Sequence, residues 1–235
     1  MDGGCYNLHR RGSGGHRVGL MKIVIFPLSN VVFFPHTRLP LHIFEPRYRQ
    51  MLTDCLAGER RVAVVLLRPG WEADYYGRPA VYSVAGAGEI VASETRPDGR
   101  SDILLQGLGR IAIEGELSSP KPYRIARASW LDDVYPPGGE GALALQTDRL
   151  HRVCGQLLST LPHPVPGFFE VVTKRDRPGP FVDRVTNLVM HEMEQRQRLL
   201  EVIDVERRMT EVIAYLEALL VRMERGSPGA RARWN

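Results

Sequence analysis

The chain has 235 residues, of which 43% are hydrophobic and 25% are charged, a balance typical of a globular protein with its own core. Its longest continuous apolar run, residues 62–67, is only as long as a strand, whereas a membrane-spanning helix needs about 20 apolar residues. The three cysteines, Cys5, Cys55 and Cys154, are widely spaced and form no CxxC pair. We therefore expect a cytoplasmic protein with no membrane span, no disulfide framework and no zinc site.

The net charge of +4 raises the question of whether the protein binds nucleic acid. The positions of the charges along the chain argue against such binding. Residues 1–20 carry a formal charge of +2 and residues 225–235 carry +3, which leaves −1 for residues 21–224. Because phosphate binding needs several clustered cations, the body of the chain is a poor candidate for binding nucleic acid. We expect residues 1–20 and 225–235 to be a disordered leader and a disordered tail, since both are polar and lack hydrophobic periodicity.

Residues 21–135 are expected to form a β-rich subdomain. Short runs rich in β-branched and aromatic residues, separated by turn residues, predict strands. These runs are 23–28, 31–34, 39–44, 62–67, 82–92, 103–106, 110–117 and 123–131. Within the fifth run, Gly86 and Gly88 indicate a bulge or a close approach of another backbone segment. The sequence Arg-Pro-Asp-Gly at 96–99 predicts a tight turn between the fifth run and the sixth.

One helix interrupts these strands. Pro46 has the fixed φ that suits a first helical turn, which makes Glu45 the N-cap, and Gly58 is a natural end. The apolar face of this helix consists of Tyr48, Met51, Leu52, Cys55 and Leu56. Cys55 lies on that face, so we expect a packing role for its thiol.

Beyond the Pro-Pro-Gly-Gly sequence at 136–139 the apolar period changes to 3.6 residues, which predicts a helical subdomain over residues 136–224. Apolar stripes predict helices over 143–158 and 181–189, and a short charged helix is expected over 194–202. Asp204 is placed to cap a final helix. The predicted fold class is therefore α+β, a β-rich subdomain followed by a C-terminal helical bundle.

The sequence lacks the motifs of common catalytic sites. No lysine follows a glycine, so a phosphate-binding P-loop is absent, and neither HExxH nor GxSxG occurs. His151 and Cys154 lie three residues apart on an expected helix, but no second pair completes a metal site. Ser119 and Lys121 lie in a polar loop, where the lysine stays protonated and does not activate a serine. We therefore expect no catalysis, no cofactor and no bound metal.

Two neighbouring motifs resemble a known family. Residues 25–35 read IFPLSNVVFFP and residues 39–48 read LPLHIFEPRY, and this pair resembles the opening of the Lon protease N-terminal, substrate-binding domain. Similar segments follow in order at 60–65, 84–90, 98–107 and 196–201, although Ala85 stands where glycine is usual in the family. The likeness covers about residues 22–222 and implies a PUA-like pseudo-barrel followed by a helical bundle.

The resemblance also implies a function. It suggests a module that binds unfolded or partly folded polypeptides, as an adaptor for a protease or another protein partner, or as a weak holdase. Since the ATPase and peptidase parts of the full-length protease are not in this sequence, we expect a stand-alone domain without enzymatic activity. The alternative is an RNA-binding protein, because PUA-like barrels elsewhere bind RNA and the arginine-rich ends could contact phosphates. Nothing in the sequence specifies a small-molecule ligand.

Two segments are candidate polypeptide-binding surfaces. Trp71, Tyr75 and Tyr76 fall in a loop rich in glycine and proline, where aromatic rings suit the capture of exposed apolar side chains. The other interpretation is that these rings fold back over the core. Phe33, Phe34 and His36, which follow the second expected strand, form the second candidate.

The second motif also has a purely structural interpretation. Leu41, Ile43 and Phe44 are expected in the core, and Glu45 with Arg47 is expected to form an ion pair at the corner between strand and helix.

Overall fold

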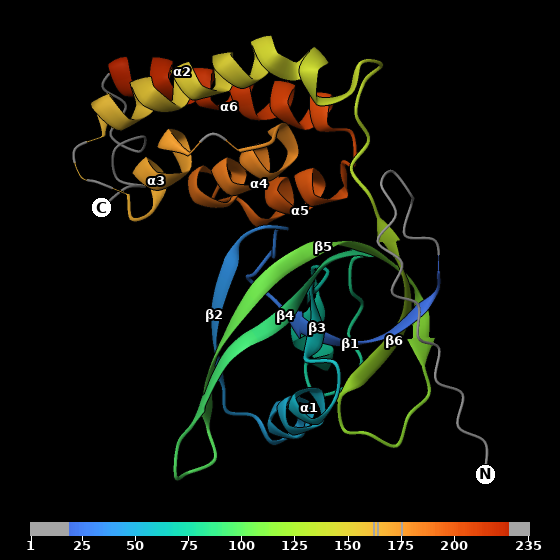
Figure 1. Ribbon diagram of the computed structural model, residues 1–235. Helices are drawn as coiled ribbons and strands as arrows, with labels where there is room; N and C mark the ends of the chain where they lie inside the picture. The colour runs from blue at the N-terminus through green and yellow to red at the C-terminus, as the bar shows by residue number, and fades with distance from the viewer. Residues whose placement is uncertain (1–18, 162, 164, 175, 226–235) are drawn as a thin grey trace.

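The computed structural model describes residues 19–225 except residues 162, 164 and 175, so nearly all of the predicted leader and tail lies outside the described residues. The strands are β1 (Met21–Leu28), β2 (Arg38–Ile43), β3 (Arg61–Leu66), β4 (Val84–Thr95), β5 (Ser101–Leu117) and β6 (Arg124–Leu131). They follow the order β2-β5-β4-β3-β1-β6, and β6 also pairs with β5. This last pairing closes five strands into a barrel, which β2 extends along the first half of β5 (Figure 1).

The helices lie on both sides of the barrel. Helix α1 (Pro46–Ala57) packs on one side, and a short 3₁₀ turn, η1 (Trp71–Asp74), follows β3. A layer of helices covers the opposite side: α3 (Phe168–Thr173), α4 (Pro178–Val189) and α5 (Met193–Glu201) lie next to the barrel. Above them, farthest from the strands, run α2 (Ala144–Thr160), which follows the 3₁₀ turn η2 (Gly139–Leu143), and α6 (Val205–Glu224) (Figure 1).

The predicted α+β class is confirmed, and so are several details of the sequence prediction. Helix α1 has Glu45 as its N-cap and Pro46 in its first turn. At the start of α6 the Asp204 carboxylate accepts a hydrogen bond of 2.9 Å from the backbone amide of Arg207. The turn after β4 is closed by a hydrogen bond of 2.8 Å from the amide of Gly99 to the carbonyl of Arg96. The boundary at residue 135 between two subdomains stays a prediction.

The structure differs from the sequence prediction in three places. Residues 31–34, predicted as a strand, belong to an extended connection between β1 and β2 that pairs with no strand. The runs 103–106 and 110–117 form one long strand, because β5 continues through Gly107 and Gly109 as it passes from β2 to β6. Helix α3 was missed, since six residues are too few to show a helical period. Among the described residues, no helix is both long enough and apolar enough to span a bilayer.

The β1–β2 connection (residues 29–37) joins two cores. Phe33 packs in the barrel core, whereas Phe34, its neighbour in sequence, packs in the core of the helical bundle. The connection lies so close to the sheet that a Cβ atom at Gly86 would overlap the carbonyl oxygen of Phe33. At Gly107 a Cβ atom would likewise overlap the carbonyl oxygen of Phe34. The close approach predicted from the glycines of β4 is therefore confirmed.

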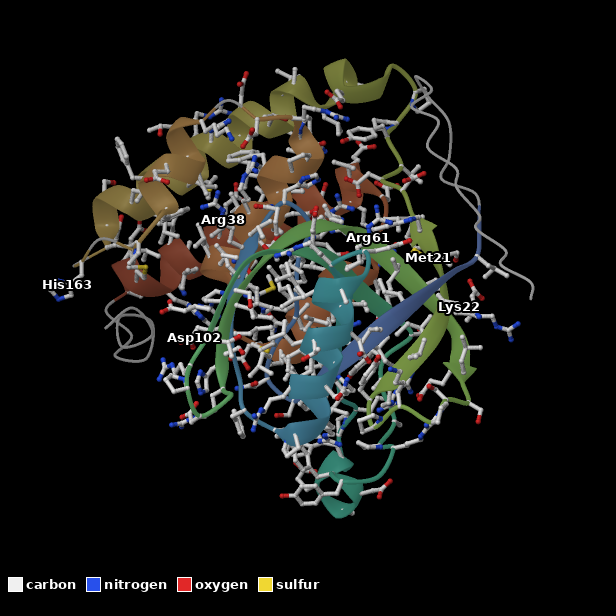
Figure 2. All side chains as sticks on the ribbon, turned by 60° about the horizontal axis from the view of Figure 1, so that its bottom comes forward. Met21, Lys22, Arg38, Arg61, Asp102 and His163 are labelled. Carbon is white, nitrogen blue, oxygen red and sulfur yellow. The ribbon has the colours of Figure 1, made fainter. Side chains whose placement is uncertain are left out.

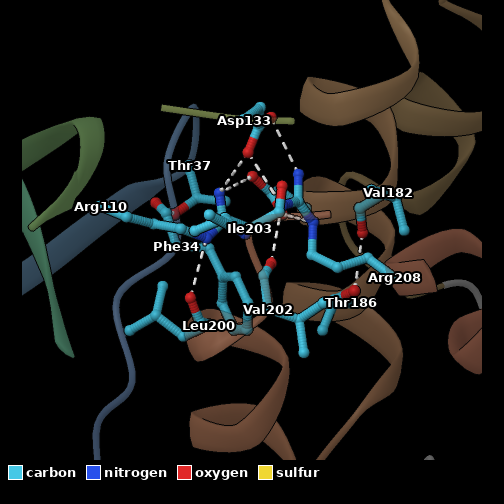
Figure 3. Close-up of polar contacts among 11 residues, drawn as sticks. Phe34, Thr37, Arg110, Asp133, Val182, Thr186, Leu200, Val202, Ile203 and Arg208 are labelled. Atoms are coloured by element: carbon cyan, nitrogen blue, oxygen red, sulfur yellow. Dashed lines mark hydrogen bonds and ion pairs between the residues drawn. The ribbon is translucent and has the colours of Figure 1, made fainter. Parts of the chain in front are cut away.

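A buried network of four charges also ties the barrel to the bundle (Figure 3). Arg110 of β5 donates two hydrogen bonds, of 2.9 and 2.5 Å, to the carboxylate of Asp183 in α4. Arg208 of α6 contacts both oxygens of Asp133, at 2.8 and 2.9 Å, and Asp133 lies 3.3 Å from Arg110. Arg110, Asp183 and Arg208 are at most 2% exposed. Two cations thus face two anions, so no buried charge in the network lacks a partner.

Replacing Gly86 with alanine should lower the free energy of unfolding by about 3 kcal/mol, because the added methyl group displaces the backbone of Phe33. Gly115→Ala is the matched control, since a Cβ atom at this other strand glycine meets no atom within 4 Å. Urea denaturation followed by circular dichroism measures both variants. Equal unfolding midpoints for the two would contradict the close approach.

Asp183→Asn should destabilise the fold by about 3 kcal/mol, because Arg110 and Arg208 then share a single carboxylate in a buried site. The control is Glu217→Gln, which breaks the solvent-exposed pair between Arg149 and Glu217 and should cost less than about 1 kcal/mol. The same denaturation experiment compares them. If Asp183→Asn lost no more stability than Glu217→Gln, the network would not hold the two parts together.

Candidate polypeptide-binding surface

Three aromatic side chains, which we call the aromatic ridge, line the segment after β3: Trp71, Tyr75 and Tyr76. The ring centroids of Trp71 and Tyr75 are 5.5 Å apart, those of Tyr75 and Tyr76 are 5.1 Å apart, and both pairs meet edge to face. Tyr76 is 88% exposed, while the other two are partly buried. None of the three contributes to the hydrophobic cores found among the described residues. The rings therefore do not fold back over the core.

The start of α1 holds the aromatic ridge in place. The hydroxyl of Tyr75 donates a hydrogen bond of 2.6 Å to the carboxylate of Glu45. This bond to a carboxylate raises the pKa of Tyr75, which keeps the hydroxyl protonated as the donor. Glu45 also pairs with Arg47 at 3.0 Å, which confirms the predicted ion pair. The Arg47 guanidinium lies over the rings of Tyr48 and Tyr75, at 4.6 and 5.2 Å from their centroids.

Phe44 is a further exposed aromatic residue at the same corner. We predicted it in the core, and this prediction is wrong, because its side chain is 58% exposed. Successive side chains of an extended segment point in opposite directions, so the burial of Ile43 turns Phe44 outward. The ring of Phe44 stacks on His42 with 6.0 Å between centroids. The alternation of β2 was the signal in the sequence that could have identified Phe44 as a surface residue.

The second predicted surface does not exist as proposed. Phe33 and Phe34 are only 2% and 0% exposed, so neither ring can contact a partner in this conformation. They are buried because the β1–β2 connection runs between the barrel and the helical layer. Of this group only His36 is exposed; its φ is 60°, and its amide donates a hydrogen bond of 3.1 Å to the carbonyl of Gly107.

The residues that might have carried chemistry are engaged in packing or in an ion pair. The ring of His151 stacks on Phe181 at 4.1 Å between centroids and contacts the carbonyl of Val172 at 3.0 Å through Nδ1. Cys154 is fully buried, and burial raises the pKa of its thiol to about 12, which leaves it unreactive. The ammonium of Lys121 lies 2.8 Å from the carboxylate of Asp54. Across the described part of the chain, no three His, Cys, Asp or Glu residues gather to hold a metal.

Comparison with known proteins adds a family to this geometry. Residues 22–218 match the family described as the ATP-dependent protease La (LON) substrate-binding domain. The Lon protease of Anaeromyxobacter dehalogenans is 29% identical over 194 residues, which cover 82% of this chain and 22% of that protein. Lon protease 2 of Myxococcus xanthus is 28% identical, with coverage of 82% and 23%. The chain thus spans about a quarter of the length of these relatives.

Solved structures show the same fold. The N-terminal domain of a Lon protease from the Mycobacterium avium complex superposes with a TM-score of 0.66 at 13% identity, covering 84% of this chain and 98% of that one. A Lon N-terminal domain protein from Xanthomonas campestris gives a TM-score of 0.58 at 21% identity, with coverage of 83% and 98%. At such identities the likeness concerns the arrangement of the strands and helices, which is shared over nearly the whole of both domains.

Proposed function

Because this chain belongs to the LON substrate-binding domain family, we propose that it is a recognition module that binds unfolded or partly folded polypeptides through the aromatic ridge and Phe44. The observation that carries this proposal is the exposure of Tyr76 on a segment that Glu45 and Arg47 hold in place. Unfolded chains differ from folded ones in displaying apolar side chains. Rings that are already held in a fixed arrangement and are at least partly exposed can bind such side chains without first losing conformational entropy.

We further propose that the chain contributes binding without catalysis. The family match supports this, because residues 22–218, most of the chain, match a substrate-binding domain. Delivery of polypeptide to a protease, or weak protection of unfolded chains, would both use such a module. A reducing, cytoplasmic location agrees with the free, buried thiols of Cys55 and Cys154.

Replacing Tyr76 with serine should raise the Kd for reduced, unfolded casein about tenfold, since the most exposed ring of the ridge is lost. The fold should be unaffected, because among the described residues the ring of Tyr76 contacts no aromatic ring except that of Tyr75. Fluorescence anisotropy of labelled casein measures binding, and thermal unfolding checks the fold. Phe169→Ser is the matched control, since Phe169 is 68% exposed on α3 and lies outside the ridge.

Equal losses in both variants would indicate non-specific hydrophobic adsorption and would count against the ridge. Failure of the unaltered chain to bind casein would refute the proposed function itself. The RNA alternative is tested with a fluorescent single-stranded RNA. Tight binding at physiological salt that survives removal of residues 1–20 and 225–235 would favour RNA over polypeptide as the ligand.

A further inference from the structure

A cavity of about 200 Å³ lies where the β1–β2 connection meets the turn between α4 and α5. Its wall is apolar on one part and cationic on another. The apolar part includes Val31, Leu39 and Met193, and the polar part includes Arg38, Asn187 and Arg196. A closed apolar cavity of about 150 Å³ holds a benzene molecule, so this one has room for a small apolar group with a charged group attached.

The cationic wall carries a charge that no carboxylate among the described residues neutralises. Arg196 donates to the backbone carbonyls of Asn187, Met190 and Val32 at 2.9, 2.8 and 3.1 Å, and to the side-chain oxygen of Asn187 at 2.7 Å. All of these acceptors are neutral, and no carboxylate of the described residues forms an ion pair with Arg196. Burial accordingly lowers the pKa of Arg196 to about 10. Arg110 and Arg208, by contrast, each face carboxylates.

A second unpaired guanidinium lies at the rim of the same cavity. Arg38 is exposed at the start of β2, and within residues 19–225, apart from the three positions not described, its side chain has no ion-pair partner. In Figure 2, Arg38 lies where β2 meets the helical layer, to the left of Met21.

The backbone of Arg38 is also directed toward the open side. The amide of Gly107 donates a hydrogen bond of 2.9 Å to the carbonyl of Thr37, so in the alternating antiparallel pattern the amide of Arg38 points away from β5. Since β2 is the edge strand of the sheet, no strand of the described residues pairs with this amide. Arg38 therefore offers a guanidinium and a backbone donor that no described residue pairs, on a residue that lines the same cavity as Arg196.

We propose that this cavity binds a carboxylate of the recognised polypeptide, either its chain terminus or an acidic side chain, together with a neighbouring apolar side chain. The proposal rests on the proposed function and adds a chemical preference to it. A carboxylate would accept charge-assisted hydrogen bonds from Arg38. Its negative charge would also lie near Arg196, whose four terminal N–H groups already donate to oxygens of this chain. Polypeptide is favoured over nucleic acid because Val31, Leu39 and Met193 suit an apolar side chain, which a phosphate backbone does not provide.

Three fluorescein-labelled hexapeptides test the preference: glycine-serine repeats ending in alanine-leucine with a free carboxylate, the same peptide as its amide, and that amide with aspartate in place of alanine. Fluorescence anisotropy with the full chain should show at least one of the two acidic peptides binding about tenfold more tightly than the neutral amide. Tighter binding of the first alone assigns the site to chain termini, and tighter binding of both assigns it to carboxylates in general.

Arg38→Gln should remove most of this difference without affecting the fold, because Arg38 is exposed. Arg127→Gln is the matched control: Arg127 is an exposed arginine on β6 without an ion-pair partner in the described part of the chain, and its loss should leave the difference intact. Arg196→Lys keeps the charge but loses the planar donor geometry, so it should weaken binding of the acidic peptides. Thermal unfolding of this variant is measured first, to check that it is folded.

Equal affinities for the three peptides would overturn the proposal, as would a preference that persists in Arg38→Gln. Tighter, Arg38-dependent binding of a six-nucleotide oligouridylate would overturn the assignment to polypeptide. Binding of reduced casein distinguishes the carboxylate site from the proposed polypeptide binding through the aromatic ridge. If casein binds to the unaltered chain but the acidic peptides show no preference, the carboxylate site fails and the proposed function stands. If the acidic peptides bind as expected but casein does not depend on Tyr76, the site stands and the ridge fails.

Discussion

The structure depends on two adjacent phenylalanines that point into different cores. Side chains of an extended backbone alternate in direction, so a single short connection can place Phe33 in the barrel and Phe34 in the bundle. Burying each ring contributes about 2–3 kcal/mol. The connection can lie this deep only because Gly86 and Gly107 present no Cβ to its backbone. The barrel and the bundle therefore cannot separate without exposing an aromatic ring to water.

The charges of the interface follow a consistent pattern with one exception. Arg110 and Arg208 are buried with Asp183 and Asp133, so their desolvation is offset within the fold. Arg196 of α5 faces the β1–β2 connection, and its described contacts are with neutral groups: four oxygens and the ring of Phe34, whose centroid lies 5.3 Å from the guanidinium. Arg196 is only partly buried, but removing a cation from water without an anionic partner is still unfavourable. Its presence beside an accessible cavity is the feature of this interface that packing alone does not explain.

The motif that identifies the family combines structural and surface roles within five residues. Tyr48 packs in the barrel core, and Glu45 and Arg47 hold Tyr75 of the aromatic ridge by a hydrogen bond and a ring contact. Phe44 projects outward from the same corner. The rigid start of α1 thus positions an aromatic surface that has little secondary structure of its own. Such a loop surface on a rigid scaffold suits the binding of side chains of varied shape.

The sequence alone determined the α+β class, most strands and helices, the caps at Glu45 and Asp204, and the family, because each depends on short-range periodicity, turn chemistry or a contiguous motif. It also pointed to the aromatic ridge, since a cluster of rings among glycines and prolines is visible locally. Only the tertiary structure decided that Phe33 and Phe34 are both buried, because no local pattern shows that the β1–β2 connection runs between the barrel and the helical layer. Arg110 and Asp183 are separated by 73 residues, and no local pattern relates them. Contacts of this kind arise from chain topology, which brings distant residues together only after the sheet has closed and the helices have packed against it.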